Sequence, residues 1–137
     1  MQFWQNKQKK AIQADLFSEQ ADGLAKKIHE DGLDERGKIK HNKPSQIRKF
    51  YDEVVRFDSR LKENQDEFSV LLPYLMMLNA KAAYAEGRGL ISKSFKTFLS
   101  ESLKQVKDRD DFEVFANLFE AFMGFYKFYR PSEGGSK

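Results

Sequence analysis

The strongest hydrophobic pattern of the chain lies near its C-terminal end, over residues 110–130. Aromatic side chains recur there at steps of three and four residues, which places them on one face of an α-helix. They are Phe112, Phe115, Phe119, Phe122, Tyr126 and Tyr129. The polar positions fall on a narrow opposite stripe of Glu113, Asn117, Glu120 and Lys127. A helix with so little polar surface is packed on several sides, so we expect the remaining helices to surround it.

Four earlier segments show the same helical spacing of apolar residues, over about residues 11–29 (or 18–29), 43–64, 66–87 and 91–107. Pro44 fits the first turn of the second segment, where either Asn42 or Ser45 could cap the helix. Pro73 predicts a kink or a division in the third. At the start of the last helix, Asp110 and Glu113 have the spacing of a capping box.

These patterns predict the fold class and the domain organisation. No alternating strand pattern bounded by hairpin turns is present, so we expect an all-α protein, a compact bundle of about five helices around the aromatic-rich C-terminal helix. A chain of 137 residues suggests one domain. We place this single helical domain over residues 11–130. Residues 1–10 are expected to be a flexible N-terminus or a segment that docks on a partner, and residues 131–137 a disordered tail.

The charge is modest overall but unevenly distributed. The chain has 24 Lys and Arg against 21 Asp and Glu, a net charge of +3. Residues 36–49 contain no carboxylate, while Arg36, Lys38, Lys40, Lys43, Arg48 and Lys49 all fall there. Because the start of a helix also presents unpaired backbone N–H groups, this region favours anion binding. A second stripe in the third segment, Tyr74, Met77, Lys81, Tyr84 and Arg88, carries two cations that a pure core stripe would lack.

Signatures of catalysis are missing from the sequence. It has no cysteine and two histidines, and it contains neither a glycine-rich phosphate loop nor a His-Glu-x-x-His motif. The paired acids Asp66–Glu67 and Asp110–Asp111 are interpreted as helix starts. We therefore expect a protein that is not an enzyme and that needs no metal and no cofactor. No apolar run is long enough for a membrane span or follows the N-terminal charges as in a secretory signal, which predicts a cytoplasmic protein.

Three blocks, in this order and spacing, resemble the small subunit of the type III-A CRISPR effector, the Csm complex. They are SQIRKF (Ser45–Phe50), AKAAYAEGR (Ala80–Arg88) and FEAFMGFYKF (Phe119–Phe128), within a similarity from about Lys43 to Tyr129. The resemblance implies a non-catalytic, all-helical protein of prokaryotic antiviral defence. Several copies would line the inner face of a helical ribonucleoprotein. They would contact each other, the repeating backbone subunit, the large polymerase-like subunit, and the backbone of the crRNA–target RNA duplex.

The cations and the resemblance together predict the RNA-binding residues. Foremost are Lys43, Gln46, Arg48, Lys49, Lys81 and Arg88, followed by Lys93, Lys96 and Lys127. We expect Arg48 and Arg88 to share one groove. Tyr84 and Tyr126 could stack on bases, but core packing is the preferred interpretation for both. The alternative function is a helical protein–protein interaction module of the complex without direct RNA contact. A third hypothesis is a helix-turn-helix DNA regulator, but no short helix pair joined by a tight glycine turn presents a polar recognition helix.

Overall fold

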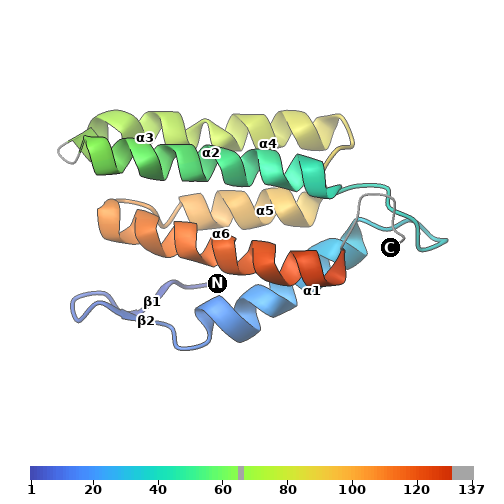
Figure 1. Cartoon of the computed structure of the whole chain (residues 1–137), viewed down its shortest axis with the longest axis horizontal. Coiled ribbons are helices and arrows are strands. Elements are labelled where there is room, and N and C mark those ends of the chain that lie inside the picture. Colours follow the sequence, from blue (N-terminus) through green and yellow to red (C-terminus); the bar gives the residue numbers. More distant parts are fainter. Residues whose placement is uncertain (65–66, 131–137) are drawn as a thin grey trace.

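The computed structural model describes residues 1–64 and 67–130 and confirms the all-α class (Figure 1). The elements in chain order are β1 (Trp4–Asn6), β2 (Ala11–Ile12), the π-helical turn η1 (Leu16–Gln20), α1 (Ala21–Asp31), α2 (Pro44–Glu63), α3 (Phe68–Met76), α4 (Leu78–Gly87), α5 (Lys93–Leu103) and α6 (Arg109–Tyr129). The third predicted helix is thus divided into α3 and α4. The division falls at Met77, while Pro73 lies inside α3. The expected tail, residues 131–137, and the expected start of the third helix at position 66 lie outside the described residues.

Helix α6 lies in the middle of the bundle. In Figure 1, α2 runs beside α3 and α4 in one layer, α5 and α6 form the next, and α1 with the β1–β2 hairpin covers the far side of α6. The α6 residues Phe112, Phe115, Phe119 and Phe122 are fully buried. The rings of Phe119 and Phe122 meet those of Phe95 and Phe98 on α5 at centroid distances of 5.4–6.2 Å. The central placement predicted for this helix is confirmed.

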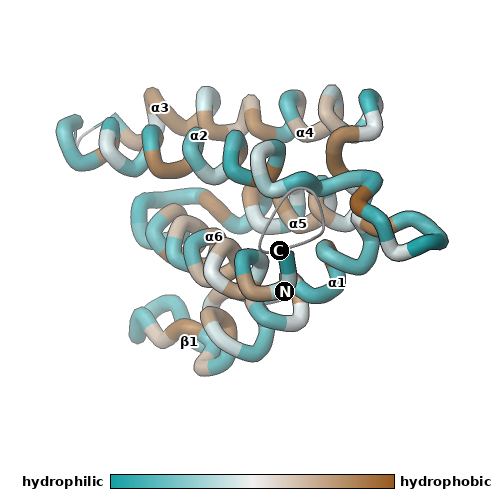
Figure 2. The backbone as a smooth tube through the Cα atoms, turned by 45° about the vertical axis from the view of Figure 1, so that its right-hand side comes forward, coloured by the Kyte–Doolittle hydropathy of each residue, from teal (hydrophilic) through white to brown (hydrophobic). Residues whose placement is uncertain are grey.

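The predicted buried stripes of α2 and α5 also form the core. On α2 they are Ile47, Phe50, Val54, Phe57 and Leu61, and around α5 they are Ile91, Phe95, Phe98, Leu99, Leu103 and Val106. Along the helices the hydrophobic positions alternate with hydrophilic ones, whereas the loop between α1 and α2 is mostly hydrophilic (Figure 2). Within residues 1–64 and 67–130, no helix combines the length and the apolarity that a membrane crossing requires.

The first ten residues differ from the expected frayed end. β1 and β2 pair as an antiparallel hairpin, and Phe3 is fully buried in the core. The backbone N–H of Phe3 donates to the Gln105 side chain at 3.0 Å. The aromatic side chain therefore anchors a segment whose composition alone suggested flexibility.

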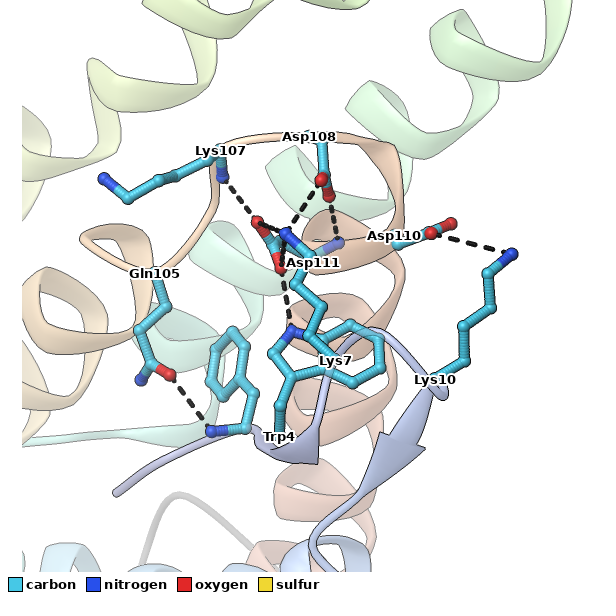
Figure 3. Close-up of polar contacts among 9 residues, drawn as sticks. Trp4, Lys7, Lys10, Gln105, Lys107, Asp108, Asp110 and Asp111 are labelled. Carbon is cyan, nitrogen blue, oxygen red and sulfur yellow. Dashed lines mark hydrogen bonds and ion pairs between the residues drawn. The ribbon is translucent and has the colours of Figure 1, made fainter.

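The hairpin is fixed to the start of α6 by polar contacts (Figure 3). Trp4 Nε1 donates to Asp111 at 2.8 Å, and Lys7 Nζ lies 2.8 Å from Asp108 and 3.0 Å from Asp111. Burial is the largest single influence on the pKa of Asp108 and raises it, but the hydrogen bonds from Lys7 and the Asp111 backbone N–H, together with the charge of Lys7, leave the pKa of this carboxyl lowered. The acidic start of α6 thus serves as the docking point of the N-terminus.

The start of α6 also corrects the predicted cap. Asp108, rather than Asp110, is the N-cap, because its backbone is extended (φ −148°, ψ −178°) and its side chain accepts from the Asp111 N–H. The expected capping box of Asp110 and Glu113 is wrong, since Asp110 already lies within the first turn and Glu113 is exposed.

Neither predicted cap of α2 caps that helix. Lys43 occupies the N-cap position, without a side-chain cap. Asn42 is fully buried at a positive φ of 63°, and its amide donates to the Ile28 carbonyl and to Ser92 Oγ. Asn42 therefore ties the loop to α1 and α5 instead of capping α2.

Gly32, at the end of α1, allows a close approach between three segments. A Cβ atom there would lie 2.5 Å from the His41 carbonyl oxygen and 2.9 Å from Arg130 Nη2. We expect Gly32→Ala to lower the free energy of unfolding by about 1–3 kcal/mol, because the loop backbone must move. Urea denaturation measures this effect.

Gly23→Ala is the matched control for that substitution. Gly23 lies in the same helix and has no neighbouring atom within 4 Å of an added Cβ. This change should stabilise by about 0.5–1 kcal/mol, because alanine has the higher helix propensity. Equal stabilities of the two variants would contradict the tight approach at Gly32.

Candidate nucleic-acid interface

A surface groove of about 440 Å³ runs between α2 and α4. We call it the α2/α4 groove, and its lining residues are Gln46, Lys49, Phe50, Asp52, Glu53, Arg56, Lys81, Tyr84, Ala85, Arg88 and Leu90. On α2, the spacing of Gln46, Lys49, Glu53 and Arg56 by three, four and three residues puts them on one helical flank. The two helices lie side by side in Figure 1, so segments far apart in the sequence line one groove.

The groove is cationic. Four cations and two carboxylates line it, a net charge of +2. Lys81 Nζ lies 3.0 Å from Glu53, and Arg56 lies 2.9 Å from the same carboxylate. The hydrogen bond from Lys81 lowers the pKa of Glu53, so this carboxylate stays ionised and holds Lys81 at the groove wall.

Two other groove residues remain available for a ligand. Lys49 forms no hydrogen bond or ion pair through its side chain within the described parts of the chain. Arg88 follows α4 directly, donates to Tyr84 Oη at 3.2 Å, and lies over the Tyr84 ring at 5.7 Å from the centroid. No carboxylate among the described residues forms an ion pair with either cation.

A smaller hollow continues the groove along α3. It shares Glu53, Arg56 and Lys81 with the α2/α4 groove and adds Arg60 and Tyr74. The concave surface beside α2 therefore extends along both α3 and α4, with exposed tyrosines at Tyr74 (62% exposed) and Tyr84 (66%).

Arg48 does not line this groove, so the expectation that Arg48 and Arg88 share one groove is wrong. Arg48 lies two residues, or about 200° of helix rotation, from Gln46. It acts electrostatically on Tyr51, whose ring lies 5.4 Å from that of Phe119 on α6. Arg48 thus belongs to the flank of α2 that faces α6.

The furrow on that other flank has the opposite charge. Its ionisable lining residues are Asp58, Lys62, Glu113 and Glu120, a net charge of −2. A polyanion would be repelled there and attracted to the α2/α4 groove. The two flanks of α2 are therefore electrostatically distinct.

The remaining predicted cations lie outside the α2/α4 groove. Lys43 immediately precedes α2 and is exposed. Lys93 lines a separate pocket between α1 and α5, and Lys96 lies 3.6 Å from Glu86. Lys127 is exposed on α6. The groove thus gathers Gln46, Lys49, Lys81 and Arg88 from the predicted set.

The two tyrosines considered for stacking have opposite environments. Tyr126 is buried as expected, its hydroxyl donates to the Asn42 carbonyl, and burial raises its pKa to about 12. The prediction that Tyr84 packs in the core is wrong, because its side chain is 66% exposed.

Sequence reasoning missed Glu53 and Arg56 as groove residues. Both were available from the spacing of three and four residues that links them to Gln46 and Lys49. Within α2, Arg56 pairs with Glu53 three residues before it. The ion pair in which Lys81 donates to Glu53 joins two helices. The spacing of residues within one helix cannot predict such a contact.

The fold and the groove define an all-helical protein with a cationic, tyrosine-edged binding surface. Within the described ranges, no group of three or more His, Asp or Glu side chains could hold a metal ion. The family model described as Csm2 Type III-A matches residues 12–132. The protein "CRISPR system Cms protein Csm2" of Streptococcus thermophilus is 32% identical over 87 residues, which cover 62% of this chain and 70% of that relative. No solved structure gives a significant match.

The chain belongs to the Csm2 family of type III-A CRISPR small subunits. This family membership confirms the resemblance inferred from the three sequence blocks.

Proposed function

We propose that this protein is a non-catalytic small subunit that lines the inner face of a type III-A interference complex and binds the backbone of the crRNA–target RNA duplex. The observation that carries the proposal is the α2/α4 groove with its net charge of +2, in which Lys49 and Arg88 have no acidic partner among the described residues. Base pairing between guide and target supplies sequence recognition, so this subunit needs only to neutralise phosphates.

The four predicted RNA-binding residues that line the groove have distinct parts in this proposal. Lys49 and Arg88 contact phosphate oxygens, and Arg88 can do so with its planar fork of N–H donors. Lys81 contributes charge from the wall, where Glu53 positions it. The amide of Gln46 suits a 2′-hydroxyl, which donates and accepts hydrogen bonds.

The proposed partners are crRNA and target RNA, further copies of this chain, the repeating backbone subunit and the large polymerase-like subunit. The setting is the cytoplasm of a prokaryotic cell. Two further predicted cations would contact RNA only outside the groove. Lys43 is exposed at the start of α2, and Arg48 lies on the other flank of that helix. Lys93, Lys96 and Lys127 remain secondary proposals for contacts elsewhere on the duplex.

The alternative is a helical protein–protein module of the complex without direct RNA contact. Exposed apolar side chains on and next to α3 favour it: Val70 is 63% exposed, Tyr74 62% and Met77 53%. Surfaces of this kind commonly meet protein neighbours.

Substitution of Lys49→Ala together with Arg88→Ala tests the proposal. We expect the affinity of the full chain for a short RNA duplex to fall about tenfold or more, because two phosphate contacts are lost. Fluorescence anisotropy with labelled duplex measures the affinity. Circular dichroism should be unchanged, since both side chains are exposed.

Lys104→Ala with Lys107→Ala is the matched control. Both residues are exposed cations outside the groove, so this variant has the same net charge as the test variant. Its RNA affinity should fall much less. Equal losses in the two variants, or intact RNA affinity in the groove variant, would favour the protein–protein module.

A further inference from the structure

Tyr84 exposes a large aromatic ring in the middle of the cationic groove. The side chain is 66% exposed, although its neighbours Ala82 and Ala85 on α4 are buried. Arg88 lies over the ring at 5.7 Å from its centroid, and Lys49 and Lys81 line the same groove. Binding of a duplex backbone by charge alone leaves this ring without a role.

The surroundings of the ring match the chemistry of a nucleotide. A nucleobase has a π face that stacks on tyrosine, and its phosphates are attracted to cations beside it. Arg88 lies over the ring while most of the side chain stays open to solvent, so the ring has surface left for a base. Exposed aromatic rings beside cations are the usual means of holding unpaired RNA bases.

We propose that Tyr84 is a stacking platform for one unpaired RNA base in the α2/α4 groove, with Lys49 and Arg88 holding the adjoining phosphates. The inference rests on the proposed function and extends it from backbone contact to recognition of a base outside the helix. It requires that the bound RNA present an extruded or single-stranded nucleotide at this position.

An RNA base fits this position better than a protein side chain does. The groove around Tyr84 has a net charge of +2 and carries the Gln46 amide, which can bond a base edge or a 2′-hydroxyl. The apolar residues suited to a protein partner, Val70 and Met77, lie on and just after α3, outside the groove lining. The cationic surface therefore lies in the α2/α4 groove, and the exposed apolar surface lies beside it on and just after α3.

The test compares a fully paired RNA duplex with the same duplex carrying one bulged 2-aminopurine. Wild-type protein should bind the bulged duplex more tightly and quench the fluorescence of the 2-aminopurine by stacking. Tyr84→Leu should lose the quenching and weaken binding of the bulged duplex about tenfold. Its affinity for the paired duplex should change little.

Two variants separate stacking from other effects. Tyr84→Phe retains the ring and should retain both the quenching and the preference for the bulge. Phe128→Leu removes another exposed ring, 77% exposed and outside the groove, and should behave as wild type.

The proposal is overturned if Tyr84→Leu keeps the quenching and the preference for the bulge while the protein still binds duplex RNA. In that case the proposed function survives. If wild-type protein binds neither RNA, the proposed function fails and this inference fails with it. A Tyr84→Leu variant that binds RNA normally but loses association with other subunits would place the ring in a protein interface.

Discussion

Phe119→Ala is expected to lower the free energy of unfolding by about 3–5 kcal/mol, the usual cost of deleting a buried phenylalanine ring. Phe119 is fully buried in α6. Its ring lies 5.5 Å from Phe98, 5.9 Å from Phe122 and 5.4 Å from Tyr51, so it joins α6 to both α5 and α2. The lost ring would leave a cavity shared by three helices. Chemical denaturation followed by circular dichroism measures the change.

Phe128→Ala is the control for that substitution. Phe128 lies on the same helix but is 77% exposed, so its removal should change the stability by less than about 0.5 kcal/mol. If Phe119→Ala and Phe128→Ala unfolded at the same denaturant concentration, α6 could not be the centre of the bundle.

Arg130→Met should cost about 3 kcal/mol, because a buried guanidinium and its hydrogen bonds are lost. Arg130 is only 2% exposed at the end of α6. Its Nη2 donates to the His29 carbonyl at 2.7 Å, and its Nη1 donates to the carbonyls of His41 at 2.9 Å and Asn42 at 2.7 Å. Methionine keeps much of the volume but leaves buried carbonyl oxygens without these donors.

The contacts of Arg130 also affect the pKa of His29. Arg130 Nε donates to His29 Nδ1 at 3.1 Å, and burial together with the charge of Arg130 lowers the pKa of His29. The variant should therefore show a His29 pKa closer to the ordinary value, measured by NMR titration. Lys104→Met, which removes an exposed cation paired with Glu101, should change neither stability nor this pKa appreciably. Wild-type stability of Arg130→Met would contradict the role assigned to the buried guanidinium.

Helical periodicity predicted most of the fold. The stripes of α2, α5 and α6 are dense in large apolar residues, and burial of such stripes leaves few alternative packings. Hydrophobic periodicity does not reveal the polar side chains that cap helices or hold loops, and three of these are Ser92, Asp108 and Asn42. Ser92 and Asp108 cap α5 and α6 with their side chains, and Asn42 joins the loop to α1 and α5.

The N-terminal hairpin could not be predicted for a related reason. Met1 to Lys10 has few apolar residues, and its order depends on partners more than 100 positions away, such as Asp111 for Trp4. Arg130 stands at the last position of the predicted range 110–130, and nothing in its local sequence indicates burial. Long-range polar contacts of this kind leave no local pattern.

The candidate site was predicted in part. Two separate segments supplied the predicted residues that share the groove: one contains Gln46 and Lys49, the other Lys81 and Arg88. The structure brings all four to one groove. Arg48 was grouped with them because of its charge and the sequence blocks, but the helical rotation places it on the flank of α2 that faces α6. Which flank of α2 meets α4 depends on tertiary packing, and a single sequence does not contain that information.

The most direct test of the RNA-binding claim is the salt dependence of duplex RNA affinity, compared between wild-type protein and the variant with Lys49→Ala and Arg88→Ala. If both cations contact phosphates, log K should fall with log salt concentration for wild type, and the slope should be shallower by about 1.4–1.8 in the variant. Identical slopes, or an affinity independent of salt, would contradict phosphate binding in the α2/α4 groove.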